Sequence, residues 1–166
     1  MLVIKPPAPI DIPAEVPAIF LAGSIEMGTA ENWQATITAR LADLEVVVLN
    51  PRRDDWDSTW TQSKHDARFR GQVEWELDGL DRADVVAMWF APGSHAPVTL
   101  LELGLTARSG KALVGCPDGF WRKGNVDIVC ERLAVPVVAD FEALVAATRA
   151  RVAEARPSGK RRGGAE

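Results

Sequence analysis

The segment PVTLLELGLTA, residues 97–107, follows an apolar run, VVAMWF at 85–90, and a short turn-rich link. The run of β-branched and aromatic residues predicts a buried strand. Pro97 suits the first position of a helix, because the N–H that proline lacks would have no partner there. Arg108 and Gly110 mark the end of that helix. Because the helix is apolar nearly all round, we expect it to be buried.

One charged residue, Glu102, interrupts this helix in its second turn. A buried carboxylate is costly unless it has partners or a chemical role, and the nearby helix N-terminus favours its ionised form. We interpret Glu102 as an anionic nucleophile at the bottom of a pocket. The alternative is that it lies on the one solvated stripe of the helix.

Strands and helices alternate along the rest of the chain. The expected strands cover residues 18–22, 45–49, 85–90, 111–115 and 135–138, and the expected helices cover 29–44 (capped by Thr29), 69–82, 97–107, 125–133 and 141–155. Such alternation gives a parallel sheet with helices on both faces. We therefore predict an α/β fold, a flavodoxin-like or Rossmann-like three-layer sandwich whose five-stranded parallel sheet has the order 2-1-3-4-5.

The length of 166 residues fits one domain, which we place at residues 18–155. Residues 1–17 contain five of the eleven prolines and should form an extended segment. Residues 156–166 are rich in Gly, Ser, Lys and Arg and should form a flexible basic tail.

Composition argues against several classes of protein. The net charge is −4 and the basic residues are scattered, which disfavours nucleic-acid binding. No apolar run reaches the length of a membrane span, and Lys5 is followed by prolines rather than by a signal-peptide core, so we expect a cytoplasmic protein. Cys116 and Cys130 are isolated, and only His65 and His95 are present, so neither a disulfide nor a metal site is expected.

Four loops should meet at the carboxyl edge of the sheet, where ligands bind in such folds. They cover residues 23–28, 50–57, 91–96 and 116–124. The first lacks both the P-loop ending and the GxGxxG spacing, so Gly23 and Ser24 could either approach a ligand or simply form a tight turn.

The helix at 69–82 carries a second candidate acid. If Val73, Leu77 and Leu80 face the sheet, Glu76 lies beside that stripe and can reach inward. A carboxyl group near Glu102 would provide the pair that acid–base chemistry at a sugar carbon requires. The alternative is that all the acids of this helix form a solvated face.

Two loops carry polar residues with two possible roles each. Ser94 could cap the following helix or bind a ligand hydroxyl or phosphate, and His95 could act as an acid–base group or be incidental. Trp56 and Asp57 could form part of a polar lid with a stacking ring, or of a solvated turn.

Five segments in this order resemble the nucleoside 2-deoxyribosyltransferase superfamily, in particular its shorter nucleoside 2-deoxyribosyltransferase-like branch. They are IFLAGSIEMG (19–28), NPRRDDWD (50–57), QVEWELDGLDRAD (72–84), PVTLLELG (97–104) and GFWRKGN (119–125). The resemblance implies a flavodoxin-like fold and a covalent glycosyl-enzyme intermediate. It identifies Glu102 with the family's nucleophile and Glu76 with the acid that handles proton transfer on the base.

The resemblance also guides the assignment of substrate contacts. We expect them from Gly23, Ser24, Asn50, Trp56, Asp57, Ser94, His95 and Asn125, with Trp56, Phe120 or Trp121 stacking on the base. The chain departs from the long-studied transferases at Ala96, where those enzymes have Asp, and in having no Tyr. These departures leave the substrate and the acceptor open.

The sequence thus predicts an enzyme that moves a 2-deoxyribosyl group between nucleobases through a glycosyl-Glu102 intermediate. One alternative is hydrolysis of a nucleoside or of a nucleoside 5′-monophosphate, and another is a non-catalytic nucleotide-binding sensor. The expected partners are a small nucleoside or nucleotide and a free nucleobase, without nucleic acid or membrane. No metal or organic cofactor is implied, and the resemblance implies a homo-oligomer.

Overall fold

The computed structural model describes residues 1–25, 32–57 and 59–155. Within them, a parallel sheet has the strand order β1-β3-β2-β4-β5-β6. Its strands are β1 (Leu2–Ile4), β2 (Ala18–Gly23), β3 (Val47–Leu49), β4 (Val85–Trp89), β5 (Ala112–Gly115) and β6 (Val137–Val138). β2 and β4 form the centre of this sheet.

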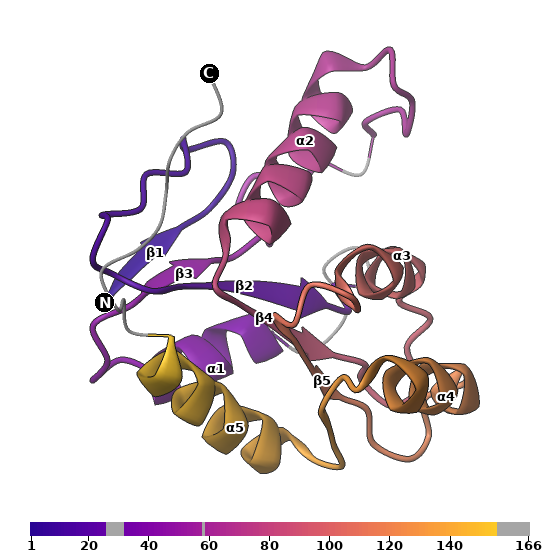
Figure 1. Cartoon of the computed structure of the whole chain (residues 1–166). Coiled ribbons are helices and arrows are strands. Elements are labelled where there is room, and N and C mark those ends of the chain that lie inside the picture. The colour runs from indigo at the N-terminus through magenta and orange to yellow at the C-terminus, as the bar shows by residue number, and fades with distance from the viewer. Residues whose placement is uncertain (26–31, 58, 156–166) are drawn as a thin grey trace.

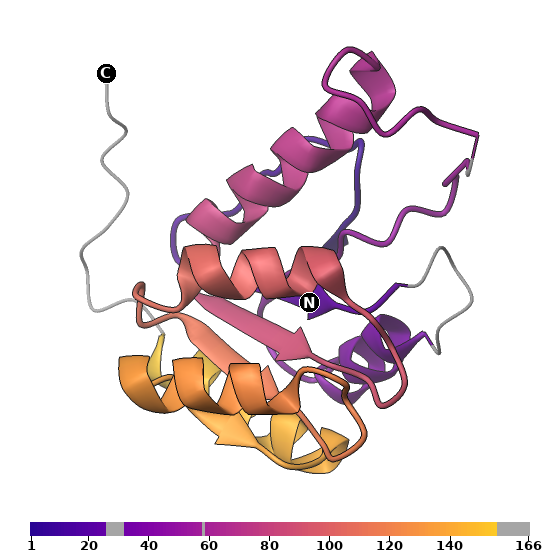
Figure 2. The same cartoon turned by 90° about the vertical axis from the view of Figure 1, so that its right-hand side faces the viewer.

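Helices cover both faces of the sheet (Figures 1 and 2). They are α1 (Trp33–Arg40), α2 (Ala67–Arg82), α3 (Pro97–Thr106), α4 (Lys123–Leu133) and α5 (Phe141–Glu154). The helices α2, α3 and α4 pack on one face, and α1 and α5 pack on the other. Among the described residues, no helix combines the length and the apolar character needed to cross a membrane.

The alternation of side chains along β2 explains the two apolar cores. Phe20 and its neighbours at 18 and 22 point into the core under α2, α3 and α4, whereas Ile19 and Leu21 point into the core under α1 and α5. Successive side chains of a strand point to opposite faces. A central strand that is apolar at every position therefore needs helices on both sides, and this is the three-layer sandwich that the sequence predicts.

The predicted order of five strands is confirmed, but the predicted number is wrong. β1 adds a sixth strand at the edge, beside β3, where Leu2 N donates to Val46 O (3.0 Å) and Asn50 N donates to Ile4 O (2.9 Å). The prolines of the N-terminal segment begin at Pro6, after this strand. Its first residues therefore keep their N–H groups, and an edge strand needs partners on one side only.

The first helix is shorter than predicted. It begins at Trp33, with Asn32 as its cap, because Asn32 Oδ1 accepts a hydrogen bond from Ala35 N (3.1 Å), and it ends at Arg40 rather than near residue 44. The predicted cap, Thr29, lies outside the described residues. A side-chain oxygen at this position satisfies an N–H of the first turn, which has no partner within the helix.

The prediction that α3 is buried all round is wrong. Val98, Leu101 and Leu105 are 56%, 64% and 57% exposed. The buried residues of the helix are Thr99, Glu102, Leu103 and Thr106. The reason is the layer architecture: α3 lies outside the sheet, so only one of its sides meets the core. That side carries polar residues, and the side away from the sheet carries apolar ones.

A glycine sets the distance between α2 and the sheet. A Cβ at Gly79 would lie 2.7 Å from the ring of Phe20, which is too close for any real side chain. Glycine thus allows α2 to approach β2 closely at this turn. The same contact fixes the position of the preceding turn, which carries Glu76.

Candidate active site

Two serine hydroxyls join the loops that follow β2 and β4. The Oγ atoms of Ser24 and Ser94 lie 2.6 Å apart, and both residues are buried. Ser94 Oγ donates to Ala91 O (2.8 Å), which uses its single proton, so Ser24 is the donor within the pair. In this arrangement both protons are used within the protein, and the pair offers a ligand acceptor lone pairs.

Packing accounts for Gly23, at the end of β2. A Cβ there would lie 2.5 Å from the ring of Trp33 and 2.7 Å from the carbonyl oxygen of Trp89. Trp33 Nε1 also donates to Ser24 O (3.2 Å). The close approach of the Trp33 ring therefore explains the glycine without a ligand, and its role in substrate binding stays a prediction.

Strained backbone precedes the helix that carries Glu102. Ala96 has φ 43° and ψ 50°, a left-handed conformation that residues with a Cβ rarely adopt. Among the described residues, no side chain caps α3, so Ser94 does not have the capping role considered for it. Such strain costs on the order of 1–3 kcal/mol and is found mostly at functional sites.

Glu102 is buried on the inner side of α3, with 6% of its surface exposed. Within the residues that the structure describes, no hydrogen bond reaches its carboxyl group. Burial, and secondarily the neighbouring Glu76, raises the pKa of Glu102 to about 8. The expected help of the helix N-terminus for the ionised form is therefore outweighed by desolvation. Burial therefore favours the protonated form of Glu102 in the free protein.

Glu76 comes from α2 and lies near Glu102. Burial raises its pKa, and a hydrogen bond from Gln72 Nε2 to Glu76 Oε1 (2.8 Å) opposes that rise. The predicted inward stripe of this helix is partly wrong, since Leu77 is 43% exposed. The buried residues of α2 are Gln72, Trp75, Gly79 and Leu80. This rotation brings Gln72 into the site, a residue that the sequence analysis missed although it lies one helical turn before Glu76.

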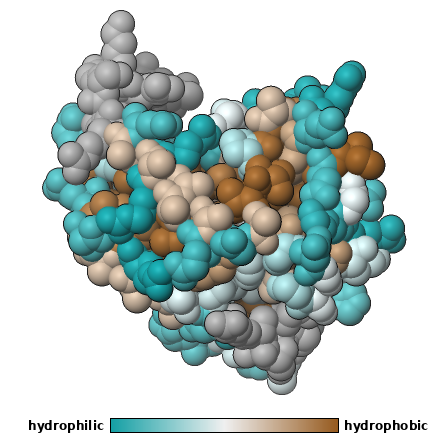
Figure 3. All heavy atoms as spheres, turned by 90° about the horizontal axis from the view of Figure 1, so that it is seen from below, coloured by the Kyte–Doolittle hydropathy of each residue, from teal (hydrophilic) through white to brown (hydrophobic). Residues whose placement is uncertain are grey.

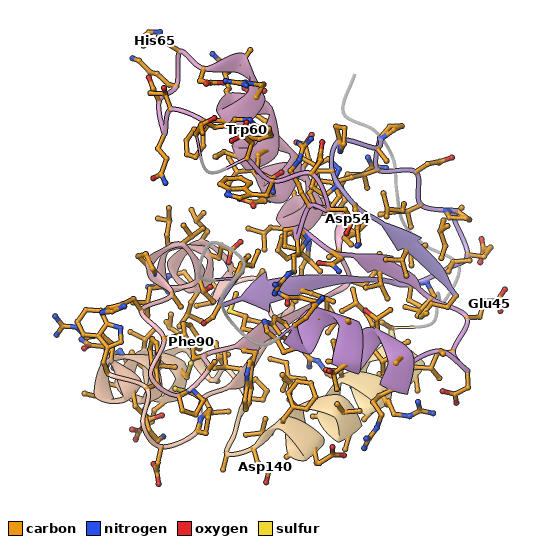
Figure 4. The ribbon with its side chains drawn as sticks, turned by 180° about the vertical axis from the view of Figure 1, so that it is seen from behind. Glu45, Asp54, Trp60, His65, Phe90 and Asp140 are labelled. Carbon is orange, nitrogen blue, oxygen red and sulfur yellow. The ribbon has the colours of Figure 1, made fainter. Side chains whose placement is uncertain are left out.

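The loop after β3 folds onto the start of α2, where Figure 4 shows Trp60. The rings of Trp56 and Trp60 are 5.3 Å apart, and the guanidinium of Arg53 lies 4.9 Å from the Trp60 ring centre. Asp57 accepts hydrogen bonds from the backbone N (2.9 Å) and Oγ1 (2.7 Å) of Thr59. Trp56 is 37% exposed and could still stack on a ligand, whereas Asp57 is engaged in its own turn.

Asn50 is buried at the end of β3. It borders a cavity of about 320 Å³ lined by Val3, Lys5, Asn32, Ala35, Thr38, Ala39, Asn50, Arg52 and Asp54. This cavity lies on the α1 side of the sheet and contains neither Glu76 nor Glu102. Asn50 Oδ1 accepts a hydrogen bond from Arg52 N (3.0 Å), and Lys5 pairs with Asp54 at 2.6 Å. A contact between Asn50 and a substrate stays a prediction.

His95 and Trp121 form an exposed corner at the start of α3. Trp121 Nε1 donates to His95 O (3.0 Å), and the ring centres are 5.7 Å apart. Trp121 is 53% exposed and could stack on a ligand. Phe120, which we also considered for stacking, is buried against Phe90 with 4.8 Å between ring centres, so packing accounts for it and its stacking on a base stays a prediction. Asn125 is exposed in the first turn of α4.

Comparisons with known proteins agree with the fold. A family model described as "Nucleoside 2-deoxyribosyltransferase like" matches residues 16–120, which is more than half of the chain. A crystal structure of a conserved protein from Enterococcus faecalis V583 superimposes with a TM-score of 0.58 at 12% sequence identity, covering 82% of this chain and 99% of that one. At this identity the likeness concerns the fold alone. No curated protein gives a significant sequence match.

Proposed function

Because this chain belongs to the nucleoside 2-deoxyribosyltransferase-like family, we propose that it cleaves the N-glycosidic bond of a nucleoside and transfers the 2-deoxyribosyl group to another nucleobase. One observation carries the proposal. Among the described residues, Glu102 has no cationic partner, is 6% exposed on the inner side of α3, and lies close enough to Glu76 of α2 for that carboxyl group to raise its pKa. Two buried carboxyl groups with perturbed pKa values and no cation between them point to a chemical role.

The reaction has two displacements at C1′. In the first, a carboxylate oxygen of Glu102 bonds to C1′ while the bond from C1′ to the base nitrogen breaks. The electron pair leaves with the base, and Glu76 gives that nitrogen a proton. In the second, the nitrogen of another base attacks C1′, the ester bond to Glu102 breaks, and Glu76 takes up the proton. Two inversions give overall retention of configuration.

The electrostatics of the pair suit this sequence of steps. Two neighbouring carboxyl groups do not ionise together readily, so they tend to share one proton. In the free protein, burial raises the pKa of both groups, that of Glu102 to about 8, so the pair tends to keep a proton. A bound nucleoside places the electron-poor C1′ beside Glu102 and a basic nitrogen beside Glu76. Both contacts favour movement of the proton from Glu102 to Glu76, which creates the nucleophile and the acid together.

The serine pair favours a nucleoside over a nucleoside 5′-monophosphate. A phosphate needs hydrogen-bond donors, but the hydroxyl protons of Ser24 and Ser94 are both held within the protein. The lone pairs of these oxygens can accept from a sugar hydroxyl instead. If water replaces the acceptor base in the second step, the same site hydrolyses the nucleoside.

Incubation of deoxyadenosine with free cytosine tests the proposal. Deoxycytidine as product supports transfer, and adenine with free deoxyribose supports hydrolysis. In Glu76→Gln both displacements should slow, because Glu76 gives a proton in the first and takes one up in the second. Mass spectrometry of the wild-type protein incubated with deoxyadenosine alone should detect a deoxyribosyl ester on Glu102. If the wild-type protein releases no base from any nucleoside or nucleotide but still binds one, the protein is a sensor rather than an enzyme.

We also propose that the chain associates with a second copy through the outer sides of α3 and its neighbours. This surface, the outer apolar face, consists of Leu77, Val98, Leu101, Leu105, Trp121, Ile128 and Val129, all at least 37% exposed. Figure 3 shows apolar spheres at the surface on the side where α4 lies. Exposed apolar patches of this kind mark association sites.

The charge and the size of the outer apolar face favour a second copy as the partner. Glu102 is the one charged residue of α3, and it points inward, so two copies of α3 can meet without like-charge repulsion. A helix of ten residues is about 15 Å long, and neighbouring helices pack about 10 Å apart. Three helices therefore offer a face of roughly 15 by 30 Å, enough for the apolar centre of an interface that buries about 800 Å² per partner.

A further inference from the structure

Gln72 is a buried amide on the inner side of α2, with 4% of its surface exposed. Its Nε2 donates to two acceptors, Glu76 Oε1 at 2.8 Å and the backbone carbonyl oxygen of Pro51 at 3.0 Å. An amide nitrogen carries two protons, so both are used. Its Oε1 is buried and has no hydrogen-bond partner among the residues that the structure describes.

These contacts fix the orientation of the amide. If the amide were flipped, its oxygen would face the carbonyl oxygen of Pro51 and the carboxyl oxygen of Glu76, and both contacts would be repulsive. The observed orientation leaves a buried acceptor unpaired, which is an arrangement that stability alone does not favour. Buried polar atoms without partners are rare in proteins, and each calls for an explanation.

The anchor on Pro51 makes Gln72 a rigid support for Glu76. Pro51 is buried and follows β3 by two residues, so its carbonyl group is fixed by the sheet. Glu74 offers a contrast on the same helix: it pairs with Arg70 at 2.6 Å, and both side chains are more than half exposed. Glu76 is therefore tied to the backbone of the sheet, whereas Glu74 is tied to a flexible side chain in solvent.

We propose that Gln72 is a positioning residue that holds Oε1 of Glu76 as its unprotonated oxygen, so that Oε2 is the atom that gives and takes the proton of the base. This inference rests on the proposed function. The chemistry follows from the donor: an oxygen that accepts an N–H bond is the carbonyl-like oxygen of a carboxylic acid, and the proton then resides on the other oxygen. Gln72 thus selects which oxygen faces the substrate and holds it in place.

The test compares Gln72→Met, which keeps the length of the side chain but has no N–H, with Glu74→Gln as a matched change on the solvent side of α2. Gln72→Met should lower kcat roughly tenfold or more with KM changed less than about threefold, because positioning acts on the chemical step. The hydrogen bond from Gln72 lowers the pKa of Glu76. Its loss should therefore move the limb of the kcat pH profile that belongs to Glu76 to higher pH. Glu74→Gln should change neither kcat nor the pH at which this limb lies.

A second readout does not depend on activity. In ¹³C NMR of the protein labelled at glutamate carboxyl carbons, Gln72→Met should shift the titration of Glu76 to higher pH. Gln72→Asn, whose amide is too short to reach both acceptors, should move it in the same direction and guards against a Gln72→Met protein that does not fold. An unchanged titration in a folded variant overturns the inference. A wild-type protein without glycosidic activity overturns the proposed function, while the titration still decides whether Gln72 controls Glu76.

Discussion

Two helices of this protein, α3 and α5, cover opposite faces of one sheet and distribute their side chains in opposite ways. α5 buries Leu144, Val145 and Val152 and places its charges outside, where Arg149 pairs with Asp43 at 2.6 Å. This is the ordinary amphipathic pattern. α3 buries Thr99, Glu102 and Thr106 beside Leu103, and exposes Val98, Leu101 and Leu105.

The inverted pattern of α3 carries a penalty on both of its sides. A buried carboxyl group loses solvation, and each large apolar side chain left in water forgoes roughly 1.5–3 kcal/mol of burial. Neither penalty applies to α5, because it buries apolar side chains and places its charges in solvent. The proposed function accounts for both penalties, with a substrate on the inner side of α3 and a second copy on its outer side. The following experiments probe that difference, from the largest expected effect to the smallest.

The largest effect is expected at the inner side of α3. Glu102→Gln keeps the size of the side chain but removes the nucleophile, so kcat/KM should fall by about 10⁴-fold or more. The equivalent change on the solvent side of α5, Glu142→Gln, should leave kcat/KM unchanged. Steady-state release of base from a deoxynucleoside measures both. Activity retained by Glu102→Gln would mean that the inverted pattern of α3 has no catalytic origin.

The next effect is a pH-dependent difference in stability. The pKa of Glu102 is raised from 4.5 to about 8 in the folded state, so the folded protein holds the proton more tightly than the unfolded chain. This contribution to stability is fully present below pH 4.5 and is lost as the pH rises through 8. The free energy of unfolding of Glu102→Gln, relative to that of the wild type, should therefore rise by on the order of a few kcal/mol between pH 5 and pH 9.

Urea denaturation at pH 5, 7 and 9 measures that difference, with Glu142→Gln on α5 as the control. Glu142 is exposed, so its variant should follow the wild-type pH dependence. Parallel curves for Glu102→Gln and the wild type would show that Glu102 is solvated in the folded protein, and α3 would then resemble α5 more closely than the structure indicates.

The outer side of α3 should give a smaller effect. Leu101→Glu places a charge at the centre of the outer apolar face, so it should weaken self-association by roughly 30-fold or more, the range of an interface hot spot. Ala146→Glu adds the same charge to the exposed side of α5 and should leave association unchanged. Analytical ultracentrifugation from 1 to 100 μM distinguishes them. A wild-type protein that stays monomeric over this range contradicts the proposed pairing.

The smallest effect is expected on the outer side of α5. Arg149 holds the pKa of Asp43 down at about 2 through a surface hydrogen bond and ion pair. Exposed pairs of this kind contribute little and are screened by salt. Arg149→Met should lower Tm slightly at low ionic strength and not measurably in 0.5 M salt. A large fall in Tm at both ionic strengths would mean that the outer side of α5 depends on its charges as much as α3 depends on Glu102.

The two carboxyl residues show how much of the candidate site can be predicted from the sequence. Glu102 was recognisable because a single charge interrupts an apolar helix, and Glu76 because it lies beside an apolar stripe. Their proximity agrees with the expectation. The stripe itself was misjudged at Leu77, because a helix with apolar residues on several sides does not reveal from its spacing which side meets the sheet. Gln72 was missed for the same reason, since a glutamine shows its role only through its acceptors on Pro51 and Glu76.

The sequence by itself determined the succession of strands and helices, because side-chain periodicity is a local property, whereas the order of the five strands was predicted from the fold class that this alternation favours. Only the tertiary structure decided which side of α3 faces the sheet, where β1 pairs, and how strongly burial raises the pKa of Glu102. Each of these depends on desolvation or on hydrogen-bond partners supplied by segments far away in the chain. A helix that is apolar on nearly every side does not contain that information until its neighbours are in place.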